Sequence, residues 1–375
     1  MAAALGSPHV KKGAAQRTGE SAPKVRQIIR SVVTQHDLAR VAGVSPTTIY
    51  NALHRPQLVC KRTLDRIYAL IREHDYMPND VARSMVRKKT DVLGIVVPVL
   101  EVLYHARLVS AIERAASAAG YTCMICQHSD DPLKEEREVM LMRQRKVDGM
   151  IIHNCGQATD SRAMQRLKAS GVPFVLVGGR VDGMDDYFVG GDDRRMAAEA
   201  VEWLIGQGHR RIATITWYRT PGDYHAGPRY LGYEDALKRH GIALDPALVE
   251  MAQTEYRSGR LEILNILRRT SSDRPTAVLA FNDPTAFSVM AGLREAGLRV
   301  PADVTVVSFG GCFDETMLEH QLPAVVEPLD EIARCACEML LGQIERKPYA
   351  KGPILVPGRF HPVSDVSVVT VSGVS

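Results

Sequence analysis

Short runs of β-branched and other apolar residues alternate with amphipathic helical stretches over most of this 375-residue chain. The apolar runs are Leu93–Val97, Met150–Ile152, Phe174–Val177, Ile212–Ile215, Ala277–Ala280 and Val304–Val307. The helical stretches between them include Leu108–Ala118, Met196–Gly206 and Asp283–Ala296. Because parallel strands need a crossover connection, and a helix is the usual one, the alternation predicts a doubly wound parallel sheet. The number of runs favours two such units.

A different pattern precedes Val92, with three short helices predicted between residues 32 and 76. Thr34 and Ser45 are suited to cap the first two helices, because their hydroxyls accept hydrogen bonds from free backbone N–H groups. Gly43 supplies the positive φ that a tight turn between them requires. Pro46 stands at a first helical position, where its missing N–H is harmless. The spacing predicts a helix, a tight turn and a second helix.

The apolar residues of these helices are spaced to form one small core. Four-residue spacing turns Ile49 and Leu53 inward and leaves Thr47, Tyr50 and Asn51 facing outward. The other two helices contribute Leu38, Val41 and Ala42, and Leu64, Ile67, Tyr68 and Ile71. The pattern predicts a helix-turn-helix, whose second helix enters the major groove of DNA with its N-terminal residues at the base edges. A generic three-helix bundle is the alternative.

Charge is distributed unevenly along the chain. Residues 1–30 and residues 31–90 each carry a net charge of +5, whereas the remainder carries −6. A basic head on an acidic body predicts a polyanionic partner for the head alone. Residues 1–30 lack apolar periodicity, so we expect a disordered tail there. That tail is either a basic arm or upstream sequence read from the wrong start codon.

Several classes of protein are disfavoured by what the sequence lacks. It has no apolar run long enough to span a membrane and no signal-peptide pattern at its start, so we expect a cytoplasmic, reduced protein. Cys123 and Cys126 lie in a short apolar run that predicts a buried strand with inert thiols, and no metal or cofactor is expected. The phosphate-binding loop, nucleophile-elbow and zinc-protease motifs are missing, and we do not expect an enzyme.

Seven segments, in the same order and spacing, resemble the LacI/GalR family of bacterial transcription regulators. They are Asp37–Ile49, Tyr76–Met85, Leu93–Pro98, Asp148–Ile152, Gly208–Ala213, Arg229–Leu237 and Val300–Phe309. The resemblance extends over nearly the whole chain from residue 33. It implies a DNA-binding head, a hinge, and a core that binds a small effector.

The resemblance places base contacts in the second helix. Pro46, Thr47 and Asn51 occupy its base-reading positions. The dipeptide Tyr50-Asn51 stands where the family usually has Ser-Arg. Because Asn suits adenine and Arg suits guanine, the operator preference of better-known members does not transfer to this chain. Phosphate contacts or helix caps are the roles expected for the remaining polar residues, which are Thr34, Ser45, Thr48 and His54.

Residues 78–90 resemble the hinge helix and linker of the family. Asn79 is placed to cap a helix of about eight residues, which is marginal in water and can form on DNA. In the family a Leu from each of two paired hinge helices opens the central base step, and Met85 holds that place here. Ala82 suits the close helix pairing, and Arg83 adds positive charge. A plain linker helix is the alternative.

For residues 91–375 the resemblance implies a two-lobed core like that of periplasmic binding proteins, with the effector between the lobes. Ligands of parallel sheets bind beyond the carboxyl ends of the strands. The candidate effector residues are Tyr104, His105, His153, Asn154, Arg229 and Asn282. For Arg229 and Asn282 the alternatives are a structural ion pair and a turn cap.

One departure from the family bears on the effector. Sugar-binding members carry an acid after an aromatic residue where this chain has Phe309-Gly310-Gly311. Without that acid near it, Arg229 favours an anionic ligand. We therefore expect a sugar or a sugar acid as the effector, with the acid favoured.

The predicted fold is an N-terminal all-α helix-turn-helix head on an α/β core of two doubly wound parallel-sheet lobes. The expected divisions are a tail (1–31), a DNA-binding domain (32–77), a hinge and linker (78–90), and an effector-binding and dimerisation core (91–375). Within the core we expect an N-lobe of about 91–188 and 326–356 and a C-lobe of about 189–325 and 357–375. We expect a homodimer that represses transcription from a pseudo-palindromic operator and releases it on binding effector. A solute-binding protein with the same core is the alternative.

Overall fold

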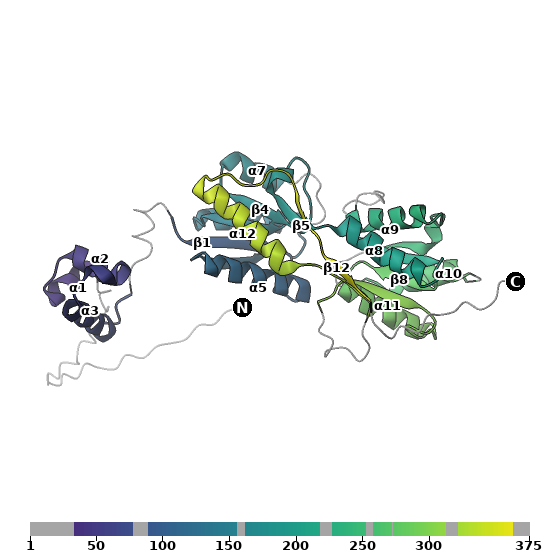
Figure 1. The fold of residues 1–375 in the computed structure, drawn as a ribbon, viewed down its shortest axis with the longest axis horizontal. Helices are drawn as coiled ribbons and strands as arrows, with labels where there is room; N and C mark the ends of the chain where they lie inside the picture. The colour runs from purple at the N-terminus through teal and green to yellow at the C-terminus, as the bar shows by residue number, and fades with distance from the viewer. Residues whose placement is uncertain are drawn as a thin grey trace, which may run out of the picture. The chain divides into compact units, whose positions relative to one another are not determined.

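The computed structural model describes residues 34–77, 89–155, 162–217, 227–252, 258–271, 273–312 and 322–362. Contacts divide the chain into two compact units, residues 1–83 and residues 84–375 (Figure 1). The first unit contains the small helical head. The second unit contains both parallel sheets.

The head consists of α1 (Gln35–Ala42), α2 (Pro46–His54), a short 3₁₀ turn (Pro56–Leu58) and α3 (Lys61–Glu73). A capping box begins α1: the Asp37 N–H donates to Thr34 Oγ1 over 3.2 Å, and the Thr34 N–H donates to Asp37 Oδ2 over 3.1 Å. Gly43 ends the helix in the left-handed conformation, with φ 60°. Ser45 then caps α2 by accepting from the Thr48 N–H over 3.1 Å. The predicted helix, turn and helix are present.

One apolar cluster holds the three helices of the head together. Its buried members are Leu38, Ala39, Ala42, Ile49, Ala52, Ile67 and Tyr76, and Leu53, Leu64 and Ile71 pack against them. Tyr68 adds a hydrogen bond from its hydroxyl to the Ala52 carbonyl, 3.0 Å long. The prediction was wrong for Val41, which is 57% exposed. The buried stripe of α1 runs through Leu38, Ala39 and Ala42, which turns Val41 toward solvent.

The second unit contains two six-stranded sheets, in the orders β11-β5-β4-β3-β1-β2 and β12-β10-β9-β8-β6-β7. All pairs in the first sheet are parallel, and in the second only β12 runs antiparallel, beside β10. The strands are β1 (Val92–Val97), β2 (Thr122–Gln127), β3 (Gly149–His153), β4 (Phe174–Val177), β5 (Phe188–Gly191), β6 (Ile212–Trp217), β7 (Val249–Ala252), β8 (Ala277–Ala280), β9 (Thr305–Gly310), β10 (Ala324–Val326), β11 (Ile354–Val356) and β12 (Arg359–His361). The predicted pair of doubly wound lobes is confirmed.

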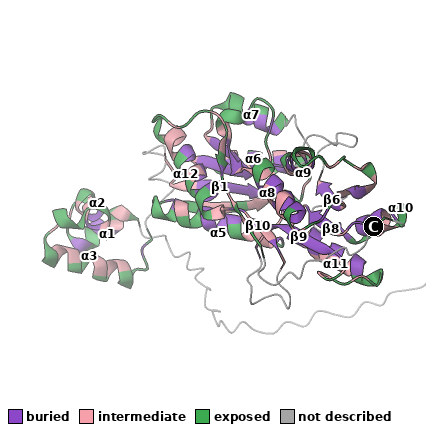
Figure 2. Ribbon diagram, turned by 45° about the vertical axis from the view of Figure 1, so that its right-hand side comes forward, coloured by how far each residue is buried: buried purple, intermediate pink, exposed green. Residues whose placement is uncertain are grey.

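Helices cover both faces of each sheet, so the strands form the buried layer (Figure 2). In the first lobe α5 (Leu103–Ala118) and α12 (Leu329–Glu345) share one core with the sheet, and α6 (Pro132–Gln144) and α7 (Arg162–Ser170) share another. In the second lobe α8 (Asp193–Gly206) and α9 (Pro228–Arg239) cover one face, and α10 (Arg260–Arg269) and α11 (Asp283–Glu295) cover the other. No helix in the described part of the chain is both long and apolar enough to cross a bilayer.

The chain passes between the lobes three times, after β5, after β10 and between β11 and β12. Strand β5 belongs to the first sheet as far as Gly191, three residues beyond the predicted boundary at 188. Strand β10 keeps Val326 in the second sheet, although the prediction assigned this residue to the first lobe. The expected boundaries, about 188 and about 326, lie within three residues of the ends of these two strands.

Strand β2 is present as predicted, but it is not buried. It forms an edge of the first sheet, and its residues are exposed or half-buried. Cys123 packs on the α5 side of the sheet and Cys126 on the α6 side, because residues three apart in a strand point to opposite faces. The two thiols therefore cannot bind one metal ion together.

Candidate functional site

In the head, α2 presents a polar face to solvent. Thr47, Tyr50 and His54 are exposed and Asn51 is half-buried, at a spacing that puts all four on one side of the helix. The Tyr50 and His54 rings meet edge to face, with centroids 4.6 Å apart. These four side chains are among those predicted to contact DNA.

The polar residues at the helix starts already have partners within the head. The Thr34 hydroxyl donates to Asp37 Oδ2 over 2.6 Å, and the hydroxyls of Ser45 and Thr48 lie 2.9 Å apart. Pro46 occupies the first turn of α2. Of the two roles predicted for Thr34 and Ser45, the structure contains the caps. The predicted hinge residues Asn79, Ala82, Arg83 and Met85 lie outside the described residues.

In the core, Arg229 is the centre of a polar group at the first turn of α9. Its Nε donates to Asp193 Oδ2 over 2.9 Å, and its Nη2 donates to Glu327 Oε2 over 3.1 Å. Its Nη1 donates to the Phe281 carbonyl over 2.6 Å. Asp193 follows β5 and Glu327 follows β10, so Arg229 joins two of the three segments that connect the lobes. The planar guanidinium suits three such partners in one plane.

Arg229 is also held by an aromatic face. Its guanidinium carbon lies 3.7 Å from the centroid of the Phe309 ring, within the range of a cation–π contact. The side chain of Glu327 is only 4% exposed, and burial raises its pKa to about 7 although Arg229 acts in the opposite direction. Burial opposes the charge of Arg229, but Asp193 and Glu327 raise its pKa above the ordinary value.

Tyr104 brings the first lobe into this group. It lies in the first turn of α5, and its hydroxyl donates to Glu327 Oε1 over 3.4 Å. Burial raises the pKa of the Tyr104 phenol well above its usual value, so it stays a donor at neutral pH. The polar group therefore includes side chains of both lobes.

The other candidates of the first lobe lie beside Tyr104. The rings of His105 and His153 meet edge to face, with centroids 4.9 Å apart, and each also contacts the Tyr104 ring. His105 is fully buried, and its Nδ1 lies 2.9 Å from the Val99 carbonyl. Asn154, which follows His153 in the sequence, is buried, and its Nδ2 donates to the Cys155 carbonyl over 3.4 Å. The structure thus brings three of these residues, Tyr104, His105 and His153, into direct contact.

Asn282 caps α11, since its Oδ1 accepts from the Thr285 N–H over 2.9 Å. This is the turn cap given as the alternative to effector binding. The next residue, Asp283, explains the unusual Phe309-Gly310-Gly311 sequence. Its carboxylate accepts from the N–H groups of Gly311 and Cys312, over 3.2 and 2.9 Å. A Cβ on Gly310 would lie 2.8 Å from Asp283 Oδ2, and both glycines have positive φ. Glycine is therefore required for the loop to approach this buried acid.

The premise that no acid stands near Arg229 is wrong. Asp193 and Glu327 replace the acid that the loop after Phe309 lacks, and they come from segments far from it in sequence. Sequence reasoning missed both residues. Glu327 directly follows β10 and Asp193 stands two residues after β5, so the rule that picked out His153 and Asn154 applies equally to them.

Two family models match the chain. Residues 34–79 match the bacterial regulatory proteins of the lacI family, and residues 201–362 match a periplasmic binding protein-like domain. Catabolite control protein A of Staphylococcus epidermidis is 27% identical over 88% of this chain and 97% of its own length. The transcriptional repressor PurR of Erwinia tasmaniensis is 29% identical over 84% of this chain and 92% of its own.

Solved structures share this fold. A lac repressor dimer, bound to operator and the anti-inducer ONPF, has a TM-score of 0.76 at 23% identity, covering 88% of this chain and 97% of the other. The transcriptional regulator CelR in complex with cellobiose has a TM-score of 0.63 at 27% identity, covering 88% and 98%.

A helix-turn-helix head followed by a two-lobed binding core defines the class of ligand-controlled, DNA-binding transcription regulators. Both parts are present here in that order. The similarity to catabolite control protein A and to PurR covers 97% and 92% of the lengths of those proteins. The chain belongs to the LacI/GalR family of bacterial transcription regulators.

Proposed function

We propose that the chain is a cytoplasmic, homodimeric repressor whose affinity for a pseudo-palindromic operator is lowered by a neutral polyhydroxy effector, such as a sugar. The observation that carries the effector proposal is the group formed by Tyr104, Asp193, Arg229 and Glu327. It includes both lobes, so a ligand bound there alters the contact between them. No catalytic role is proposed for it.

The charges of this group argue against an anionic effector. One cation, Arg229, faces two carboxylates, and the buried Asp283 lies close enough to raise the pKa of Glu327 further. An incoming carboxylate or phosphate would meet net negative charge in a buried setting, where repulsion is strong. The sugar acid favoured by the sequence is therefore the less suitable of the two predicted effectors.

The hydrogen-bonding capacity of the group favours a ligand with hydroxyl donors. Asp193 Oδ1 is buried and has no hydrogen-bond partner among the described residues. From the described residues, Glu327 Oε1 receives only a long bond, 3.4 Å, from Tyr104. Both oxygens are acceptors that a sugar hydroxyl can satisfy, and the aromatic rings nearby suit the apolar face of a sugar ring. CelR, a structural relative, is a complex with cellobiose.

For DNA binding we propose that Thr47, Tyr50 and Asn51 read bases from α2, with Pro46 at its start, and that His54 contacts the phosphate backbone. Exposure of this face supports the proposal. The hinge residues Asn79, Ala82, Arg83 and Met85 are proposed to enter the minor groove, as the family resemblance implies. Among the structural relatives, a lac repressor dimer is bound to operator.

A homodimer is proposed because one head buries too little area to be specific alone. Apolar side chains exposed at one edge of the first lobe suit a second copy: Ile125 on β2 is 42% exposed, and Leu133 and Met140 on α6 are 73% and 41% exposed. All three lie at this edge of the lobe, with Ile125 on the α5 side of the sheet and Leu133 and Met140 on the helix that covers the other side.

The test begins with selection of bound sequences from a random duplex pool by the full chain, followed by titration in salt. We expect an enriched palindrome and a steep fall of affinity with salt. A solute-binding protein without regulatory DNA binding would give neither. Nothing but weak, uniform binding would contradict the proposed operator recognition.

The selected duplex then serves to identify the effector class by fluorescence anisotropy. Panels of neutral sugars, the matching sugar acids and amino sugars are added to the complex. We expect release by one or more neutral sugars and no release by the acid of the same sugar. Glu327→Gln should weaken the response to that sugar at least about tenfold, because a charge-assisted hydrogen bond is lost. Release by sugar acids alone would overturn the effector proposal and leave DNA recognition intact.

A further inference from the structure

A second polar cluster lies in the first lobe, beyond the carboxyl ends of β2 and β3. It consists of His128, Asp130 and Cys155, whose donor atoms all lie within 4.8 Å of one another. His128 follows β2 directly, and its backbone N–H donates to the Val97 carbonyl at the end of β1 over 2.9 Å. Cys155 stands two residues after β3. The sheet order β3-β1-β2 therefore brings the two loops together.

The hydrogen bonds around His128 determine which of its ring nitrogens can act as a metal ligand. Nε2 lies 2.8 Å from the His153 carbonyl, which can only accept, so Nε2 carries the proton. The lone pair of Nδ1 then faces Asp130, whose backbone N–H lies 3.2 Å away. A histidine that binds metal usually donates its other N–H to a carbonyl or carboxylate in this way, which fixes the ring.

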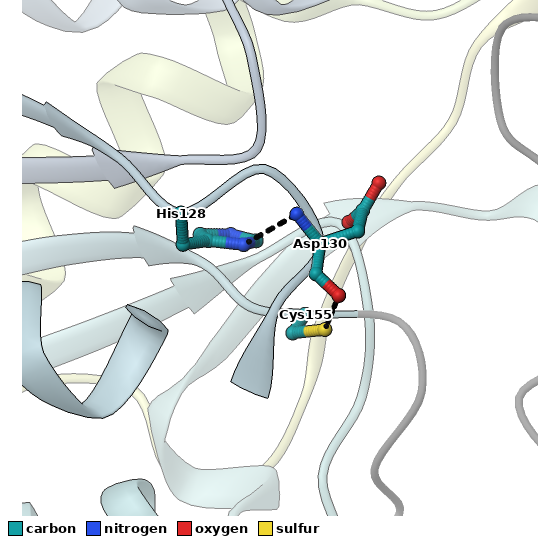
Figure 3. A group of neighbouring side chains, drawn as sticks. All are labelled: His128, Asp130 and Cys155. Atoms are coloured by element: carbon teal, nitrogen blue, oxygen red, sulfur yellow. Dashed lines mark hydrogen bonds between the residues drawn. The ribbon is translucent and has the colours of Figure 1, made fainter. Parts of the chain in front are cut away.

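The other two residues complete a mixed donor set. Figure 3 shows the Asp130 backbone between the His128 ring and the Cys155 thiol, with the carboxylate turned outward. The Cys155 thiol donates to the Asp130 carbonyl over 3.0 Å, and its backbone N–H donates to the buried carboxylate of Glu135. The amide oxygen of Asn154, one residue before Cys155, is buried and has no hydrogen-bond partner among the described residues. The buried carboxylate of Glu135 adds negative charge beside the cluster.

We propose that His128, Asp130 and Cys155 bind one Zn²⁺ ion, with a fourth position for water or another ligand. Imidazole, carboxylate and thiolate are the ligands that zinc prefers. Zinc bonds of 2.0–2.3 Å place tetrahedral donors about 3.5 Å apart, so binding draws the three atoms together by about 1 Å. The thiol releases its proton to the buffer as the sulfur–zinc bond forms. His128 Nδ1 gives up the hydrogen bond from the Asp130 N–H and binds the ion instead.

This site could not be predicted from the sequence, because its donors come from two loops rather than from one short spacing motif. Bound zinc would tie the loop after β2 to the loop after β3. The carbonyl of His153, whose ring contacts Tyr104, takes part through His128. The site is independent of the effector class and of the operator.

The test uses the untagged full chain, stripped with a chelator and kept reduced with a phosphine, and titrates it with Co²⁺ as the spectroscopic probe. We expect one equivalent of Co²⁺ to produce a thiolate-to-cobalt charge-transfer band, and Zn²⁺ to abolish it. Calorimetry of Zn²⁺ binding in two buffers of different ionisation enthalpy should show release of about one proton.

Two variants and one control make the outcome specific. Cys155→Ser should abolish the sulfur band. Asp130→Asn keeps both hydrogen bonds of Figure 3, which use the backbone, and should weaken Co²⁺ binding at least about tenfold. Cys60→Ser removes the exposed thiol of the head and should change nothing. The proposal is overturned by a missing sulfur band, by an undiminished band in Cys155→Ser, or by its loss in Cys60→Ser. If Cys155→Ser does not fold, an unchanged affinity of Asp130→Asn for Co²⁺ would overturn the proposal by itself.

Discussion

At the scale of single residues, the core depends on a buried ion cluster rather than on an isolated arginine. Arg229 contacts Asp193, Glu327 and the Phe281 carbonyl, so each of its three nitrogens has a partner. Removing one member of such a cluster leaves the others buried with uncompensated charge, and this costs several kcal/mol. Glu327 is the member most sensitive to pH, because burial raises its pKa to about 7.

The raised pKa predicts how stability depends on pH. A carboxyl with a higher pKa in the folded state keeps its proton longer there, so its contribution to stability is present below about pH 4.5 and is lost as pH rises through about 7. The loss is at most about 3 kcal/mol, from the difference of the two pKa values. We expect Glu327→Gln to lack this decline, measured as the free energy of unfolding between pH 5 and 8.

Both tryptophans, Trp203 and Trp217, lie in the second lobe, so their fluorescence reports unfolding of the part that contains Arg229. Glu331→Gln is the matched control, since Glu331 is exposed and Arg334 lowers its pKa. It should keep the decline of the unmodified chain. Equal pH profiles for Glu327→Gln and the unmodified chain would contradict the protonation argument.

At the scale of elements, the head depends on its turn and caps. Gly43 ends α1 in the left-handed region, where an L-residue with a Cβ costs about 1–2 kcal/mol. The surrounding space is open at this position, so conformation alone sets the cost. We expect Gly43→Ala to raise hydrogen exchange of residues 34–77 at least about fivefold, measured by mass spectrometry.

The same substitution at Gly206 should have the opposite sign. Gly206 is the last residue of α8, has no positive φ and also has open space where a Cβ would lie. Alanine there favours the helix by up to about 1 kcal/mol. We expect slower exchange in α8 for Gly206→Ala and faster exchange in the head for Gly43→Ala. Because both substitutions add the same methyl group, opposite effects would show that backbone conformation, not side-chain size, determines the outcome. Similar effects at both positions would contradict this account.

The elements were predictable from local sequence, whereas the ion cluster of the core was not. Thr34, Gly43 and Ser45 specify caps and a turn through bonds to residues three or four positions away, and these were predicted. Asp193 and Glu327 meet Arg229 only after two lobes have assembled from distant segments. Both acids follow strands, but the local sequence does not show which of the polar residues at strand ends will meet Arg229. Val41 was predicted to be buried because its spacing fits the apolar stripe of α1. It is exposed because the other helices of the head do not cover that position.

At the scale of the whole molecule, the edge of the first sheet predicts assembly. Ile125 lies on edge strand β2 and is partly exposed. An unpaired carboxylate buried in an apolar contact between two copies would weaken their association by more than about 1.4 kcal/mol, which is a factor of ten in affinity. We expect Ile125→Glu to raise the dimer dissociation constant at least about tenfold, measured by analytical ultracentrifugation.

Leu355→Glu provides the control at the opposite edge of the same sheet, on β11. Leu355 is 45% exposed, close to the 42% of Ile125, so the two substitutions cost the monomer about equally. This control should remain dimeric. Dissociation caused by Leu355→Glu and not by Ile125→Glu would place the contact between copies on the other edge.

The order of segments in the core has a consequence for synthesis on the ribosome. The first lobe takes β11 and α12 from residues 329–356, so its sheet and core are completed only after nearly the whole chain has emerged. The head, residues 34–77, emerges first and has its own core. An incomplete nascent chain can thus carry a folded head, including α2, before its core is finished. Without a finished core it cannot pair with a second copy. Under the proposed dimeric recognition, one head buries too little area to be specific alone, so an unfinished copy does not occupy the operator.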